Sequence, residues 1–294
     1  MNNLSVTETV NKESENLDKL DSDALVELFA DDTLNVINAL KKSKQDIAKV
    51  IDSVTECLDQ GGSLYYLGAG TSGRLGILDA VECPPTFSTE AGMVQGIIAG
   101  GEKAIIHAVE GAEDDEAAGY QVIKDTLSSR DALLVISASG GAAYCVGALK
   151  AAKELDCFRG AISNNSSAKI FSYSKNNIFL DTGAELLSGS TRLKAGTSQK
   201  IVLNIISTSV MVKLGKTYGN LMVDLKVSNE KLYKRAVSLV EKIAECSEEE
   251  AKMALEKANN KVKQAILFVK KGLEFEEATK ILKENKGFLS KVLD

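Results

Sequence analysis

The spacing of apolar residues changes from one region of the chain to the next. Between Leu17 and Gln60 apolar residues recur at helical intervals, and the pattern stops at the glycine pair 61–62. Glycine is the usual residue just past the C-terminus of a helix, because it adopts a left-handed backbone without strain. The pattern therefore predicts N-terminal helices that end at Gly61.

Beyond residue 62 the pattern changes to short apolar runs separated by helix-like stretches. Short buried strands that alternate with helices favour a parallel sheet covered by helices on both faces. We therefore expect an α/β fold, a three-layer αβα sandwich. The predicted strands are 63–67, 95–99, 133–136, 158–163 and 177–180.

After Gly183 the pattern is helical to the end of the chain. One long helix is predicted over 194–216, and four shorter ones follow from about residue 228. Ser247 with Glu250 fits a capping box, in which the two side chains bond to the backbone at the start of a helix. We expect a helical segment over 1–53, a sheet domain over 54–217 and a small helical bundle over 218–294.

Composition excludes several classes of protein. The chain of 294 residues has ordinary hydrophobic and charged fractions, 44% and 26%, and a net charge of −6, which argues against a nucleic-acid partner. Its five scattered cysteines and single histidine show no metal-ligand spacing, so we expect free thiols in a reducing cytoplasm and no metal. The polar N-terminus does not resemble a secretory signal, and no apolar stretch reaches the length of a membrane span.

Two turns rich in glycine and hydroxyl side chains follow predicted strands and precede predicted helices. They are 68–73, Gly-Ala-Gly-Thr-Ser-Gly, and 137–141, Ser-Ala-Ser-Gly-Gly. Close backbone approach, unpaired N–H groups at a helix start and hydroxyl donors suit a phosphate monoester. Neither turn fits a P-loop. The first fits a dinucleotide fingerprint, but the expected ribose-binding acid would fall near Glu90, outside any strand end, which disfavours NAD.

Two glutamates stand out as candidate acids. The only prolines, Pro84 and Pro85, predict that the helix starting near Ser72 ends at about Glu82. A carboxylate at a helix C-terminus is electrostatically disfavoured, which suits a general acid, although a plain surface glutamate is the alternative.

Glu113 lies in the acidic run 110–116. A solvated loop and helix N-terminus explain Asp114, Asp115 and Glu116. Glu113 is then either one more solvated acid or a second, inward-facing carboxylate.

Several long blocks carry a family resemblance. They are GAGTSGRLGILDAVECPPTF at 68–87, QGIIAGGEKAI at 95–105, VEGAEDD at 109–115, the stretch from TGAELLSGSTRLKAGTSQK to SNEKL at 182–232, and CSEEEAKMAL at 246–255. Together they resemble the N-acetylmuramic acid 6-phosphate etherases of the SIS (sugar isomerase) superfamily. The same blocks are similar to the vertebrate glucokinase regulatory protein, a sugar-phosphate sensor without etherase activity.

The resemblance implies a SIS fold, a homodimer without metal or cofactor, and cleavage of the lactyl ether at C3 of the phosphorylated sugar to N-acetylglucosamine 6-phosphate and D-lactate, in the recycling of cell-wall sugars. It implies Glu82 as proton donor and Glu113 as a second catalytic residue. The residues then expected to bind the sugar phosphate are Thr71, Ser72, Ser137, Ser139 and the amide of Gly140, with Arg74, Arg192 and Lys194 as charge partners that could equally cap a helix or pair with an acid.

The chain departs from the family at two positions. Where the family's second turn has Arg and Thr, this chain has Gly141 and Ala142. A charged hydrogen bond to phosphate is thereby lost, worth about 1.5–3 kcal/mol. A non-catalytic sugar-phosphate sensor that regulates a partner protein stays the main alternative, and an aldose–ketose phosphate isomerase is a third.

Overall fold

The structure, a computed structural model, describes residues 6–227 and 229–293. It divides into two compact units. The first comprises 1–80 and 92–207 and holds the sheet, and the second comprises 81–91 and 208–294 and holds the C-terminal helices.

The sheet has five strands, all parallel, in the order β2-β1-β3-β4-β5. Each strand lies within one residue of a predicted apolar run, so the parallel α/β sheet is confirmed. The strands are β1 (Leu64–Gly68), β2 (Val94–Ile98), β3 (Ala132–Ile136), β4 (Phe158–Ser163) and β5 (Asn176–Phe179).

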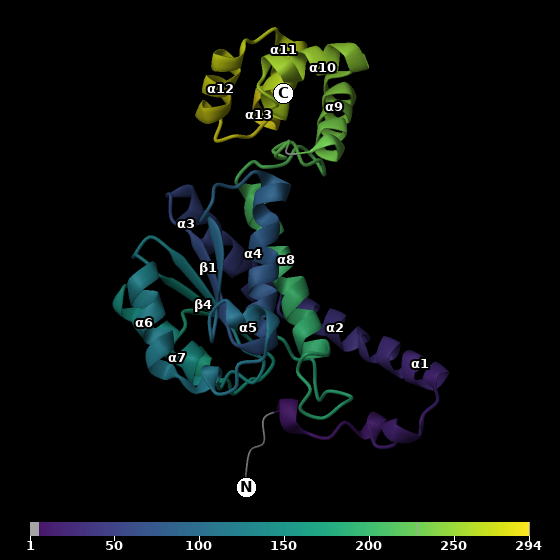
Figure 1. Ribbon diagram of the computed structural model, residues 1–294, viewed down its shortest axis with the longest axis vertical. Helices are drawn as coiled ribbons and strands as arrows, with labels where there is room; N and C mark the ends of the chain where they lie inside the picture. The colour runs from purple at the N-terminus through teal and green to yellow at the C-terminus, as the bar shows by residue number, and fades with distance from the viewer. Residues whose placement is uncertain (1–5, 228, 294) are drawn as a thin grey trace. The chain divides into compact units, whose positions relative to one another are not determined.

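Helices cover both faces of the sheet, as the uninterrupted apolar runs predict (Figure 1). Every residue of β1 and β3 is buried. The helix α7 (Ala143–Glu154) packs on β1, β3 and β4, with α6 (Glu116–Thr126) outside it, and α3 (Lys44–Asp59) contacts β1, β4 and β5. The predicted three-layer sandwich is therefore confirmed.

The remaining elements are those before the sheet, short helices between its strands, and the long helix α8 after it. The predicted N-terminal helices are present, and α3 is followed by Gly61 with a φ of +81°, as expected. The other elements are η1 (Val6–Glu8), η2 (Lys12–Ser14), η3 (Leu17–Lys19), α1 (Ser22–Asp32), α2 (Leu34–Lys42), α5 (Lys103–Ile106), η4 (Ala112–Asp114), η5 (Lys169–Ser172) and α8 (Lys194–Lys213).

The helix after the first glycine-rich turn does not end where the prolines predict. Helix α4 runs from Gly70 to Phe87 and contains both Pro84 and Pro85. Each proline removes one backbone donor, so this last part of the helix lacks two hydrogen bonds. Cys83 and Phe87 are buried there, and burial of apolar side chains, about 1.5–3 kcal/mol each, offsets that loss. The predicted break at Glu82 is wrong.

The second unit is a helical bundle with its own apolar core. The capping box at Ser247 and Glu250 is confirmed, and the four predicted helices are present together with a short fifth one. Lys263 is buried, donates to the carbonyls of Gly215 and Gly287 and pairs with Asp224. The helices are α9 (Glu230–Ala244), α10 (Glu248–Lys257), α11 (Val262–Lys271), α12 (Phe275–Glu284) and α13 (Ser290–Leu293). Within 6–227 and 229–293, no helix has the length and apolar character to cross a bilayer.

Candidate active site

The two glycine-rich turns lie side by side at the carboxyl edge of the sheet. The last residues of β1 and β3, Gly68 and Ile136, are partners in the register, so the turns leave the sheet at the same level. Strand β1 lies between β2, which follows it in the chain, and β3. In parallel α/β sheets a ligand binds at such a point of divergence, outside the carboxyl ends of the strands.

One glycine in each turn has a left-handed backbone. Gly70 has a φ of +52° and Gly140 a φ of +71°, both in the left-handed region. A Cβ at residue 140 would also lie 2.1 Å from the Cβ of Ala168, whereas a Cβ at residue 70 would meet open space. The backbone at Gly140 is therefore more tightly enclosed than the backbone at Gly70.

A pocket of about 260 Å³ opens between the turns. It brings together hydroxyl residues from both turns, residues at both helix starts and Glu113. Of the residues predicted to bind a sugar phosphate, Thr71, Ser72, Ser137 and Ser139 line it. The full lining is Glu8, Ala69, Gly70, Thr71, Ser72, Glu113, Ser137, Ala138, Ser139, Ala142, Gly189 and Thr191.

The hydroxyl groups of the pocket differ in what they already bond. Ser72 is buried and its Oγ donates to Gln199 Oε1 at 2.8 Å. Ser137 is also buried, and its Oγ accepts from the amide of Gly140 at 3.1 Å. The Gly140 amide, predicted to bind phosphate, is thus already bonded within its own turn. Ser139 is exposed.

The segment after β4 holds the second turn in place. Ser163 Oγ donates to the carbonyl of Ala138 at 3.0 Å, and Asn165 Nδ2 donates to the carbonyl of Ser139 at the same distance. These bonds hold the carbonyls of Ala138 and Ser139 in place. The exposed hydroxyl of Ser139 therefore remains as a group that the turn offers to an anion.

Glu113 lies on η4, a short helix that begins directly after Gly111, whose φ is +74°. Its carboxylate and burial together raise the pKa of the Cys145 thiol to about 12, burial being the larger cause. Asp115 accepts from the amide of Ala118 at 2.8 Å and caps α6, as predicted for the acidic run. Glu113 is the member of that run which reaches the pocket.

A second cavity, of about 210 Å³, adjoins the first and shares Ala69, Gly70 and Glu113 with it. Arg74 lines this second cavity and not the first. Its Nε donates to the carbonyl of Ile105 at 3.0 Å and its Nη2 to that of His107 at 3.2 Å. The guanidinium is thereby held in place by the backbone beside α5.

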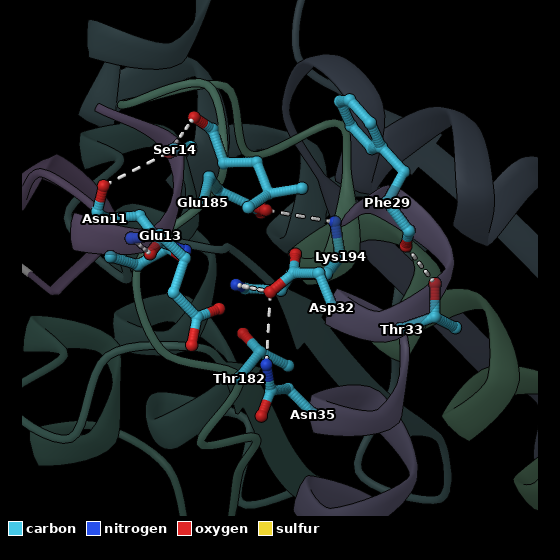
Figure 2. Close-up of polar contacts among 12 residues, drawn as sticks. Asn11, Glu13, Ser14, Phe29, Asp32, Thr33, Asn35, Thr182, Glu185 and Lys194 are labelled. Atoms are coloured by element: carbon cyan, nitrogen blue, oxygen red, sulfur yellow. Dashed lines mark hydrogen bonds and ion pairs between the residues drawn. The ribbon is translucent and has the colours of Figure 1, made fainter. Parts of the chain in front are cut away.

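The other two predicted cations lie elsewhere. Lys194 is buried and pairs with Asp32 at 2.6 Å, and Figure 2 shows Asp32 between Lys194 and Asn35. The amides of Lys194 and Ala195 donate to Glu185 at 3.1 and 2.9 Å and so cap the start of α8. Burial raises the pKa of the Glu185 carboxyl. The alternative interpretation of Lys194, pairing with an acid, describes this geometry.

Arg192 is exposed and follows Thr191, which does line the pocket. Glu82 is exposed as well and belongs to the second unit, in the segment 81–91. The structure therefore brings Glu113 and the four predicted hydroxyl residues together within the first unit and places Lys194 in an ion pair.

Several residues at the pocket were not predicted, among them Glu8 and, behind the lining, Gln199. Glu8 lines it because the N-terminal segment runs along the loop before α8, where the Gly189 amide donates to the Thr7 carbonyl and Asn11 Nδ2 to the Ala184 carbonyl. Gln199 lies behind Ser72 and donates through Nε2 to Asn164 Oδ1 at 3.0 Å. Both contacts join segments far apart in the sequence, and no local pattern signals them.

Comparisons with known proteins agree with the resemblance. Residues 46–153 match the family model of the glucokinase regulatory protein N-terminal SIS domain, and residues 219–267 match that of the C-terminal lid domain of glucokinase regulatory protein. The chain is 44% identical to the N-acetylmuramic acid 6-phosphate etherase of Clostridium acetobutylicum, over 98% of this chain and 95% of the relative. It is 46% identical to that of Bacillus mycoides, over 100% of both chains. The chain belongs to the N-acetylmuramic acid 6-phosphate etherase family.

A solved structure supports the fold of this etherase family member. A candidate sugar-phosphate isomerase from Listeria monocytogenes superposes with a TM-score of 0.50 at 14% identity, over 67% of this chain and 94% of that one. This likeness concerns the fold alone. Together with the match to the SIS model it confirms the predicted SIS fold.

Proposed function

We propose that the protein is an N-acetylmuramic acid 6-phosphate etherase, which cleaves the C3 lactyl ether to N-acetylglucosamine 6-phosphate and D-lactate. One observation carries the proposal: a carboxylate, Glu113, shares a pocket with hydroxyl groups from two helix-starting turns, in a chain 44–46% identical to named etherases. The turns suit a phosphate, and the carboxylate suits proton transfer on the sugar that the phosphate anchors.

The reaction needs one acid and one base. An ether oxygen is a poor leaving group and must take up a proton as it departs, while the C2 hydrogen is acidic only beside the open-chain C1 aldehyde. In our proposal Glu113 removes the C2 proton and Glu82 protonates the lactyl oxygen. The C3–O bond then breaks, D-lactate leaves, and a C2=C3 double bond forms.

The second half of the reaction reverses these roles. Water adds to C3 as its proton passes to a carboxylate, and C2 regains a proton from a carboxyl group. Each positioned acid or base contributes about 10²–10⁴-fold to a rate. Glu8 adds a further carboxylate to the pocket, and it suits an acceptor for a sugar hydroxyl rather than a neighbour of the phosphate.

Phosphate binding in this chain depends on neutral groups. The helices α4 and α7 begin at the pocket, so their first amide N–H groups and partial positive charge face an anion there. Thr71, Ser137 and Ser139 add hydroxyls. Ser72 already donates its hydroxyl proton to Gln199, so it meets a ligand through its amide or as an acceptor.

We further propose the oligomeric state, location and role that the family implies. The protein is then a homodimer in the cytoplasm that acts in the recycling of cell-wall amino sugars. The division into 1–53, 54–217 and 218–294 also stays a proposal. We also propose that Arg192, an exposed cation beside Thr191, contacts a bound sugar phosphate.

The test is the product formed from N-acetylmuramic acid 6-phosphate. We expect D-lactate from the wild type, and Glu113→Gln and Glu82→Gln should each lower the turnover rate by about 10²–10⁴-fold. Glu90→Gln, another exposed glutamate, is the matched control and should keep wild-type turnover. Tight binding of N-acetylglucosamine 6-phosphate without lactate release would instead support a sensor, and a ketose phosphate would support an isomerase.

A further inference from the structure

The second cavity has a different chemical character from the first. Among the described residues its lining is mostly small and apolar, and it also includes Arg74 and two glutamates, Glu110 and Glu113. It contains none of the hydroxyl residues that line the first pocket. Its full lining is Ala69, Gly70, Arg74, Ala99, Ala104, Ala108, Val109, Glu110, Gly111, Ala112 and Glu113.

Glu113 borders both cavities, so a ligand that spans them passes this carboxylate. A phosphate among the hydroxyls and helix starts would lie on one side of Glu113, and the group that the reaction removes would lie on the other. The proton transfers at C2 and at the lactyl oxygen on C3 require such an order, because the C2–H and C3–O bonds that break are neighbours and the base must reach the C2 hydrogen.

The charges of the substrate indicate which of its anionic groups Arg74 binds. N-acetylmuramic acid 6-phosphate carries two anionic groups, the phosphate and the lactyl carboxylate, and a desolvated anion needs charged or hydrogen-bonding partners. Over 6–227 and 229–293, Arg74 is the one cationic side chain in the lining of the two cavities. The hydroxyls and amides of the first pocket already serve the phosphate, which leaves Arg74 for the carboxylate.

Arg74 is built to receive a carboxylate. Its Nε and Nη2 are bonded to the carbonyls of Ile105 and His107, which fixes the guanidinium plane, and within the described parts of the chain Nη1 has no bonded partner. No ion pair joins Arg74 to Glu110 or Glu113 in those same parts, so its charge is not neutralised there. An Arg–carboxylate pair is among the stronger charge-assisted contacts in proteins.

We propose that the second cavity is the subsite for the leaving group, in which Arg74 binds the carboxylate of the lactyl arm and the alanines enclose its methyl group. The proposal rests on the proposed function and adds a specificity determinant to it. Arg74 separates sugar phosphates that carry a short carboxylate arm from those that lack it.

The test compares two ligands that differ only in that arm. In Arg74→Gln the KM for N-acetylmuramic acid 6-phosphate should rise by about 10- to 150-fold, the effect of one charged hydrogen bond. The inhibition constant of N-acetylglucosamine 6-phosphate should stay unchanged. Arg74→Lys keeps the charge without the planar fork and should fall between the two.

Two further variants separate binding from folding. Ala108→Leu, at an exposed position of the lining, should narrow the cavity and weaken the lactyl ligand alone. Arg130→Gln removes an exposed arginine elsewhere and should change neither constant. Equal weakening of both ligands in Arg74→Gln would overturn the proposal, since it would assign Arg74 to the phosphate or to the shape of the loop.

Failure of the proposed function is a separate outcome. If the wild type releases no D-lactate, the etherase proposal fails, and calorimetric dissociation constants for the same two ligands then test the subsite. An affinity difference between the ligands that disappears in Arg74→Gln supports the subsite. An affinity difference that persists, or none in the wild type, overturns it.

Discussion

The two glycine-rich turns occupy equivalent places at the ends of neighbouring strands, yet they supply the site differently. The first turn has open space around Gly70, and the helix after it carries the fixed cation Arg74. The second is enclosed at Gly140 and is followed by Gly141 and Ala142, which bring no charge. Among the residues that line the two cavities, the positive charge therefore comes from the helix after the first turn, whereas both turns supply hydroxyl residues.

The enclosure of the second turn predicts the largest difference between matched variants. Gly140→Ala meets both left-handed strain and overlap with Ala168, and should cost about 2–5 kcal/mol of the free energy of unfolding. Gly70→Ala meets strain alone and should cost about 1–2 kcal/mol. Chemical denaturation of both variants measures the difference, and equal losses would contradict the unequal packing.

The missing charge of the second turn can be restored. A Cβ at residue 141 would meet only Ser139 Oγ, at 3.8 Å, an ordinary contact, and the backbone there is not left-handed. Gly141→Arg, the residue of the family, should tighten inhibition by N-acetylglucosamine 6-phosphate by about 10-fold or more. Unphosphorylated N-acetylglucosamine is the control ligand and should gain nothing. No gain for the phosphorylated sugar would show that the turn does not face the phosphate.

Removing one hydroxyl from each turn should distinguish a serine that stabilises the fold from one that binds the ligand. Ser72→Ala leaves the buried Gln199 Oε1 without its donor and should cost about 1–3 kcal/mol of stability. Ser139→Ala removes an exposed hydroxyl and should change stability by less than about 0.5 kcal/mol while weakening sugar-phosphate binding. Thermal unfolding with and without N-acetylglucosamine 6-phosphate gives both quantities. A stable Ser72→Ala would contradict the role assigned to Gln199.

The sequence predicted the parts of the fold whose causes are local. The strands follow from continuous apolar runs, the capping box at Ser247 from two neighbouring side chains, and the turns from glycine and hydroxyl residues at strand ends. The predicted end of α4 was wrong because the packing of Cys83 and Phe87 outweighs the preference of proline, and of the residue before it, for a non-helical backbone.

The site was predictable where a motif is contiguous and not where it depends on distant segments. The register of β1 and β3 aligns the two turns, and so brings Thr71 and Ser72 beside Ser137 and Ser139. Glu113 joins them from η4. Lys194 could not be assigned from sequence, since its partner Asp32 is brought to it only by the packing of the N-terminal helices. Glu8 and Gln199 were missed for the same reason. The paired roles of Glu82 and Glu113 stay predictions.

In the proposed mechanism Glu113 removes the proton from C2 while the C3–oxygen bond of the sugar breaks. The most direct measurement is the reaction of N-acetylmuramic acid 6-phosphate in D₂O enriched in ¹⁸O, followed by mass spectrometry and NMR of both products. We predict deuterium at C2 and ¹⁸O at C3 of N-acetylglucosamine 6-phosphate, unlabelled oxygen in the lactate hydroxyl, and loss of both labels with Glu113→Gln. Label in the lactate hydroxyl, or product without deuterium at C2, would contradict the account.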